Sequence, residues 1–298
     1  MDLSQAVAEQ PVSNRQELRG ALLSWKLLLL LALIAAVYYD VVWRLIRDWS
    51  DDPNFSHGFI VPLFSAFIVW TKRKELSALA IEPSNWGFPV IVGSLSLVIL
   101  GSLGAELFVA RVSLILFLAG LIIYFLGWLY FRVLLFPWLF LFLMVPIPAI
   151  LFAQMTLPLQ TLAAKLAAAS LQLVGIPVFR EGNIIALPAM PLEVAEACSG
   201  IRSLLSLGTL AIIYGYFVDD RVAMRVILAL AAIPIAVFAN GFRIFGTGLM
   251  VQYWNPDRAL GFFHEFSGWL IFLVSMCLLF ITHKALSLIP KLKIARAQ

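Results

Sequence analysis

The sequence predicts an all-α polytopic membrane protein of about eight transmembrane helices, with an interfacial helix and a small β-hairpin on the outer side. Hydrophobic residues make up 62% of the 298 residues and charged residues only 13%, whereas about 25% of a soluble globular domain is charged. The mean hydropathy is +0.96. Because a spanning helix needs about 20 apolar residues, the chain has room for about eight spans and one modest non-spanning region.

Apolar runs separated by polar or charged turns supply these spans. The second run is short and contains Pro62, which indicates a tilted span or one that begins earlier. We expect the spans at residues 27–43, 58–70, 87–103, 112–127, 133–148, 203–217, 226–244 and 266–282.

The distribution of Lys and Arg predicts the orientation, because cytoplasmic loops carry the excess of these residues. With the N-terminus inside, 13 of the 21 Lys and Arg residues fall in inner segments and eight fall outside. We therefore expect a cytoplasmic tail at 1–26, a single transmembrane domain at 27–282 and a basic cytoplasmic tail at 283–298. His283 is expected to be a solvated residue at the inner end of the last span.

The longest non-spanning stretch, residues 149–197, is expected on the outer side. Residues 157–174 have a helical pattern, and four polar residues fall on one face of it: Gln154, Thr161, Lys165 and Gln172. An interfacial helix fits this pattern. A ninth span is the alternative, although it would place the basic C-terminal tail outside. Residues 178–187 are typical of a β-hairpin.

Three reactive side chains, Cys198, Arg243 and His264, fall at the ends of successive predicted spans. Because successive spans alternate in direction, all three are expected on the outer side. A helix N-terminus or a neighbouring cation favours the thiolate form of a cysteine. This combination suits acyl transfer. Cys198 would be the nucleophile, His264 the acid/base, and Arg243 would stabilise the oxyanion or clamp a substrate carbonyl or carboxylate.

Each residue of this trio also has a structural interpretation. A cysteine in an apolar chain packs as a small core residue, an arginine at a helix end extends to the interface, and a histidine there is an interfacial polar group. Ionisable groups so close to the hydrocarbon are nevertheless functional candidates. With three histidines and two cysteines in the chain, and no His-Glu-x-x-His motif, we expect no metal and no cofactor.

Further polar residues accompany the trio. Glu196 is expected to pair with Arg202 or to face substrate, because a carboxylate beside Cys198 opposes ionisation of the thiol. Asn240 lies one helical turn before Arg243. His57, in Ser56-His57-Gly58-Phe59, is either a substrate contact or an interfacial helix cap.

Several of these blocks together resemble the signature of the exosortase family, to which the archaeosortases are related. The blocks are Glu196-Ala197-Cys198-Ser199-Gly200-Ile201-Arg202-Ser203, Asn240-Gly241-Phe242-Arg243-Ile244, His264 ahead of a last span, and Ser56-His57-Gly58-Phe59. The resemblance implies a cysteine protease-transpeptidase of the bacterial inner membrane whose active site faces the periplasm. It implies Cys198 as nucleophile, His264 as acid/base and Arg243 as the oxyanion or substrate arginine.

The resemblance also implies partners. The substrates would be exported, membrane-anchored proteins whose C-terminal sorting signal joins a Pro-Glu-Pro motif, one transmembrane helix and a basic cluster. A polysaccharide or a lipid-linked molecule is a plausible acceptor, and the lipid bilayer surrounds the protein. No basic patch interleaved with aromatic residues points to nucleic acid.

Two other functional classes stay open. A non-catalytic component of extracellular polysaccharide export would use the outer polar cluster to bind glycan or a lipid carrier. A small-molecule transporter predicts polar residues at mid-depth on several spans and a broken helix there. Few such residues occur, since most charges lie at the ends of the predicted spans.

Overall fold

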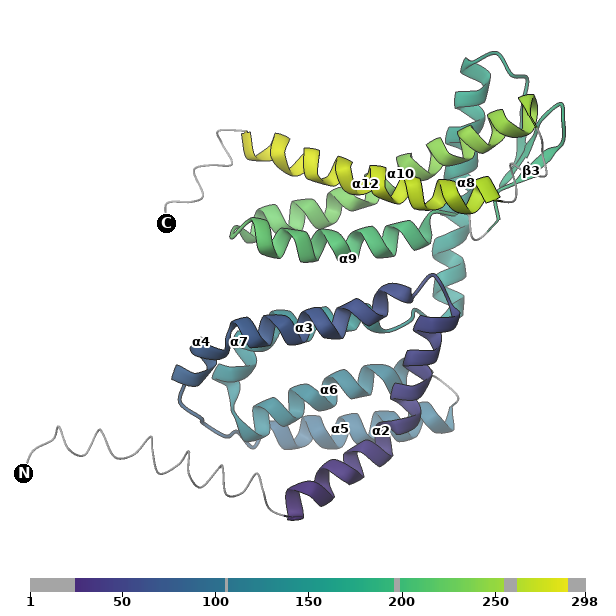
Figure 1. Cartoon of the computed structure of the whole chain (residues 1–298). Coiled ribbons are helices and arrows are strands. Elements are labelled where there is room, and N and C mark those ends of the chain that lie inside the picture. The colour runs from purple at the N-terminus through teal and green to yellow at the C-terminus, as the bar shows by residue number, and fades with distance from the viewer. Residues whose placement is uncertain (1–24, 105–106, 196–198, 255–261, 289–298) are drawn as a thin grey trace, which may run out of the picture.

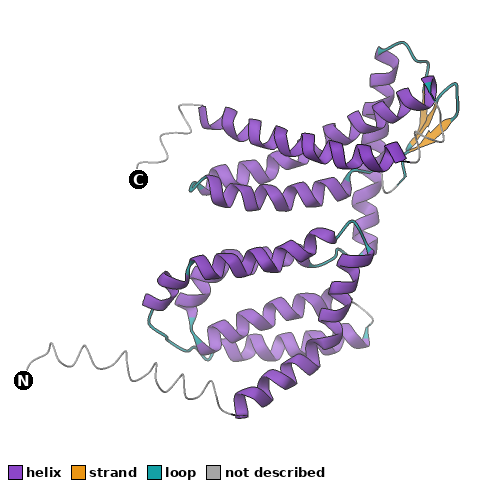
Figure 2. Cartoon of the chain, in the orientation of Figure 1, coloured by secondary structure: helices purple, strands orange, loops and turns teal. Residues whose placement is uncertain are grey.

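The computed structural model describes residues 25–104, 107–195, 199–254 and 262–288, with side chains described from 28 and from 266 onward in the first and last helices. The described chain is mostly helical, with one small sheet (Figure 2). The first half of the chain comprises helices α2 (Trp25–Asp51), η1 (Ser56–Phe59), α3 (Ile60–Thr71), α4 (Arg73–Ala78), α5 (Gly87–Leu103), α6 (Leu107–Phe125), α7 (Trp128–Phe140) and η2 (Leu141–Met144).

In the described residues of the second half lie α8 (Ala149–Leu173), β1 (Phe179–Glu181), β2 (Ile184–Ala186), β3 (Pro191–Glu193), α9 (Ile201–Val218), α10 (Val222–Tyr253) and α12 (Phe262–Leu288). In Figure 1 the helices of the first half lie together in the lower part of the molecule, and α9, α10 and α12 lie together above them. We call these groups the first and the second bundle.

A helix stands at each of the eight positions where the sequence predicts a span, but eight membrane crossings are not confirmed. Within the described residues, α2, α6, α9, α10 and α12 are long and apolar enough to cross a membrane. A sixth candidate results if residues Trp128–Met144 and α8 count as one bent span, and Ser56–Thr71 and Gly87–Leu103 are shorter apolar helices.

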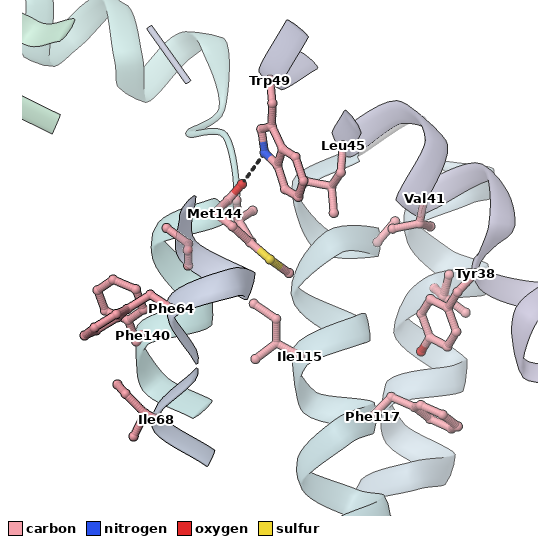
Figure 3. Packing of buried hydrophobic residues seen from close by; sticks show 14 residues of the cluster. Tyr38, Val41, Leu45, Trp49, Phe64, Ile68, Ile115, Phe117, Phe140 and Met144 are labelled. Carbon is pink, nitrogen blue, oxygen red and sulfur yellow. Dashed lines mark hydrogen bonds between the residues drawn. The ribbon is translucent and has the colours of Figure 1, made fainter. Parts of the chain in front are cut away.

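The core of the first bundle is centred on the end of α2. Trp49 donates a hydrogen bond from its indole Nε1 to the carbonyl of Met144 at 2.8 Å (Figure 3). Leu45, Ile68 and Ile115 are fully buried in the same cluster. Since a buried indole N–H needs a partner, this bond fixes the C-terminal end of α2 against η2.

A partly buried ion pair joins α2 to α6 beside this core. Arg111 is 5% exposed, and its guanidinium contacts the carboxylate of Asp48. In the charge distribution, Arg111 is one of the eight cations expected outside. Its burial is possible because Asp48, one turn before the end of α2, supplies the compensating charge.

We expect Asp48→Asn to lower the free energy of unfolding by about 3 kcal/mol, because it leaves a buried guanidinium without its counter-charge. The control is Asp40→Asn, which breaks the exposed Arg44–Asp40 pair on the same helix and should change stability by less than about 1 kcal/mol. Thermal unfolding in detergent measures both. Equal shifts in the two variants would contradict a structural role for the buried pair.

Helix α8 turns sharply away from the helix before it. The two axes differ by 81°, and in Figure 1 α8 runs across the ends of the other helices near the sheet. Its buried face is rich in alanine and packs against α10 and the sheet. The four polar residues predicted to share a face are exposed, namely Gln154, Thr161, Lys165 and Gln172. The helix begins at Ala149, eight residues earlier than predicted.

The predicted β-hairpin is confirmed and is part of a larger sheet. Strands β1 and β2 pair antiparallel, with Arg180 opposite Ile185, and Ile185 also faces Leu192 of β3. Strand β3 was not predicted, since a proline ordinarily disfavours a strand, yet Pro191 is compatible with the first residue of an edge strand. The sheet leads directly into the segment that contains Cys198.

The interpretation of His283 as a solvated end residue is wrong. Its side chain is 12% exposed, and its Nδ1 lies 3.0 Å from the hydroxyl of Tyr214. Its Nε2 lies 3.8 Å from a carboxylate oxygen of Asp219. Hydrogen bonds from Arg221 hold the pKa of Asp219 well below its usual range. This cluster ties the end of α12 to the turn between α9 and α10.

Candidate functional site

A cavity of about 410 Å³ lies where η1, α9, α10 and α12 meet. It therefore draws on both bundles, with η1 contributed by the first and the other helices by the second. Its described lining consists of Ser56, Gly200, Arg202, Ser203, Ser206, Arg243, Gly268, Trp269 and Phe272.

The segment after Cys198 enters α9 through a left-handed turn. Gly200 has φ of +81°, a region that L side chains rarely adopt. A Cβ at this position would lie 2.9 Å from the Cβ of Asn240. The hydroxyl of Ser199 accepts a hydrogen bond from the backbone N–H of Ile201 at 3.3 Å. Glu196 and Cys198 lie outside the described residues, with position 198 two residues before Gly200.

Arg243 reaches the cavity from the interior of α10. The predicted span ended at residue 244, but the helix continues to Tyr253, so Arg243 does not stand at a helix end. Asn240, one turn earlier, is 2% exposed and lies against the Gly200 turn. A Cβ at Gly268 of α12 would lie 3.3 Å from Nη1 of Arg243. The small residue on α12 thus leaves room for the guanidinium.

His264 belongs to the first turns of α12 and precedes Gly268 by four residues. Its side chain is outside the described part of the structure. The backbone therefore places position 264 one helical turn before Gly268, the residue of α12 that lies against Arg243.

Arg202 is exposed on the cavity wall and is joined to the first bundle. Its Nε donates to the side-chain oxygen of Asn54 at 3.4 Å, a long hydrogen bond. The predicted partner, Glu196, is not described. Because Asn54 belongs to the loop between α2 and η1, this contact connects the start of α9 to the neighbouring bundle.

His57 does not line the described cavity. It is 7% exposed, and its Nε2 lies 3.2 Å from the carbonyl oxygen of Leu143. A Cβ at Gly58 would overlap the indole of Trp49, and Phe59 meets the same ring edge to face. The Ser56-His57-Gly58-Phe59 block thus packs η1 against α2 and η2, which leaves Ser56 at the cavity.

The described lining is positively charged. It contains two guanidinium groups, Arg202 and Arg243, three hydroxyls and two aromatic rings, and none of the described lining residues is a carboxylate. Such a cavity suits an anionic group or a developing oxyanion on a partly apolar ligand. Among the described residues no group of three His, Cys, Asp or Glu could hold a metal ion.

Several residues of this lining were not among the predicted site residues. Ser203 and Ser206 are three residues apart on α9, as are Trp269 and Phe272 on α12. A spacing of three residues places both side chains of a pair on one helical face. Each pair could therefore have been assigned to the cavity if the direction in which its helical face points had been known. Nothing in the sequence alone indicated that orientation.

The helices and the cavity define a multi-pass membrane protein with a cationic site at the junction of two bundles. A family model described as transmembrane exosortase matches residues 49–281. Because the match covers well over half of the 298 residues, the chain belongs to the transmembrane exosortase family, and the described cavity lies within the matched part. Neither the curated proteins nor the solved structures contain a significant match.

Proposed function

We propose that this exosortase is a cysteine protease-transpeptidase that cleaves the C-terminal sorting signal of exported, membrane-anchored proteins. The observation that carries the proposal is the cavity that Gly200, Arg202 and Arg243 line. Gly200 of this lining stands two residues after Cys198 in the chain, and guanidinium groups are donors of the kind that stabilise the negative charge of a tetrahedral intermediate.

In the proposed reaction, His264 takes the thiol proton of Cys198, and the resulting thiolate attacks the carbonyl carbon of the scissile peptide bond. Arg243 donates hydrogen bonds to the oxyanion that forms. The C–N bond then breaks, and His264 gives its proton to the leaving amine, which departs with the transmembrane anchor. Water or an acceptor amine attacks the thioester, the C–S bond breaks, and Cys198 is restored.

The proposed roles of the remaining residues follow from their positions. Arg202 would hold a substrate carboxylate or carbonyl, and Asn240 would keep the Gly200 turn in place. Glu196 is proposed as a supporting residue beside Cys198. His57, expected as a substrate contact or an interfacial helix cap, would instead position Ser56 through its contact with Leu143.

The proposed topology has eight crossings of a bacterial inner membrane, with residues 1–26 and 283–298 in the cytoplasm and 149–197 at the periplasmic surface. Its support is the charge distribution and the 81° bend before α8. Impermeant thiol reagents applied from outside should label a single cysteine at position 181 but not at position 74. Equal labelling at both positions would contradict this topology.

The function is tested by co-expressing the protein with a reporter that carries a Pro-Glu-Pro motif, a transmembrane helix and a basic tail. We expect Cys198→Ala to reduce processing of the reporter at least about a thousandfold, as loss of a covalent nucleophile does. The control is Cys277→Ala, which removes an exposed thiol from α12 and should leave processing unchanged. Undiminished processing by a normally inserted Cys198→Ala variant would favour the role in polysaccharide export.

A further inference from the structure

A second cleft, of about 880 Å³, lies between α7 and α10 and is separate from the cavity described above. Helix α9 and η2 complete its walls. Most of its lining is apolar, and some of that surface faces outward: Leu139, Val226 and Leu230 are each more than half exposed. An apolar surface of this extent in a membrane protein needs an apolar occupant, either lipid or another helix.

One end of this cleft carries two cations from different bundles. Lys72 follows α3, and Arg225 stands in the first turn of α10. Their side chains are 28% and 25% exposed. The arrangement thus combines an apolar groove with a partly buried positive end.

Arg225 is held in place before any ligand arrives. Its Nε donates to the carbonyl of Asp219 at 2.6 Å, and its Nη2 donates to the carbonyl of Tyr216 at 3.3 Å. The guanidinium also stacks on the Tyr216 ring, 4.9 Å from its centroid. An arginine has five N–H donors, so three remain for a ligand. Two exposed carboxylates lie near the cations. That of Asp220, which also lines the cleft, is 3.9 Å from Arg225, and that of Glu75 is 3.7 Å from Lys72.

The charge at this end of the cleft distinguishes between the two occupants. A helix followed by a basic cluster would bring like charges towards Lys72 and Arg225. An acyl chain with an anionic headgroup places apolar surface along Leu139, Val226 and Leu230 and a negative charge near the two cations.

We propose that this cleft is a binding site for an anionic phospholipid, with the acyl chain between α7 and α10 and the phosphate at Lys72 and Arg225. Basic pockets between transmembrane helices on the cytoplasmic side recognise anionic headgroups in this way. Because α7 belongs to the first bundle and α10 to the second, the bound lipid stabilises the contact between the bundles. This site is independent of the proposed protease activity.

Binding is tested on the full-length protein, delipidated in nonionic detergent, by titrating phosphatidylglycerol and following thermal unfolding and native mass spectra. Lys72→Gln should weaken phosphatidylglycerol binding about fivefold, as expected for the loss of one cation near a headgroup. Lys74→Gln is the matched control, since Lys74 carries the same charge two residues away, is exposed and does not line the described cleft. It should leave binding unchanged.

A second variant tests the acyl-chain part of the site without changing charge. Ala229→Trp fills the cleft from α10 and should abolish the stabilisation by phosphatidylglycerol. Equal binding by the Lys72→Gln and Lys74→Gln variants would overturn the proposal, and so would equal stabilisation by phosphatidylcholine or by inorganic phosphate. Binding of a basic-tailed transmembrane peptide that Ala229→Trp blocks, with phosphatidylglycerol binding intact, would also overturn it and identify the helix as occupant.

Discussion

Replacing Arg243 with glutamine should lower processing of the sorting-signal reporter by about a hundredfold to a thousandfold. Arg243 lines the cavity from the interior of α10, beside Gly268. Removal of one preorganised oxyanion donor costs about this much in other acyl-transfer enzymes. Arg243→Lys should recover only part of the loss, because an ammonium group cannot reproduce the two parallel N–H donors of a guanidinium.

The control for this variant is Arg47→Gln. Arg47 is a largely exposed cation near the end of α2 and does not line the described cavity. The two variants should be compared at equal levels of inserted protein with equal unfolding temperatures. If Arg243→Gln processed the reporter as well as Arg47→Gln does, Arg243 would have a packing role and no part in the reaction.

Replacing Gly200 with alanine should lower processing about a hundredfold while leaving the protein inserted. The left-handed conformation at Gly200 costs a side-chain-bearing residue about 1–2 kcal/mol. The new methyl group would also approach to 2.9 Å from the side chain of the buried Asn240. Relief of this overlap moves the start of α9, and a displacement of about 1 Å at a reacting group costs on the order of a hundredfold in rate.

Gly208→Ala is the matched control for Gly200→Ala. Gly208 lies on the same helix, and a Cβ there would meet no atom within 4 Å. Because alanine favours a helix interior over glycine by roughly 0.5–1 kcal/mol, this variant should be as stable as the parent and as active. Equal activity of both glycine variants would show that the left-handed turn is dispensable for catalysis.

Much of the fold could be predicted from the sequence because apolar runs and turn signals are local. The helices, the hairpin of β1 and β2 and the exposed polar face of α8 follow from hydrophobic periodicity and charge. The full length of α10 could not be predicted in this way, because the predicted span ended where Arg243 interrupts the apolar run. The burial of Arg111 depends on Asp48, 63 residues away, and no local pattern reports such a pair.

The candidate site was predictable by residue type but not by geometry. The blocks around Cys198, Asn240 and Arg243 identify the helices that meet at the cavity. The Ser56-His57-Gly58-Phe59 block was expected as a substrate contact or a helix cap, and its Ser56 lines the cavity. The contact of Asn54 with Arg202 was not predicted, because it depends on how the first bundle packs against α9. Packing of η1 against η2 buries His57 beside Leu143, which its place at the start of a predicted span did not indicate.

Our proposal requires that Cys198 carries the acyl intermediate. The most direct test is intact-protein mass spectrometry of the membrane enzyme after it is mixed with a sorting-signal peptide. We predict an added mass equal to the N-terminal part of the cleaved peptide, localised to Cys198 by proteolysis and released by hydroxylamine. The adduct should be absent in Cys198→Ala and present in Cys277→Ala. Cleavage of the peptide without an adduct on Cys198, or with the adduct on Cys277, would contradict the account.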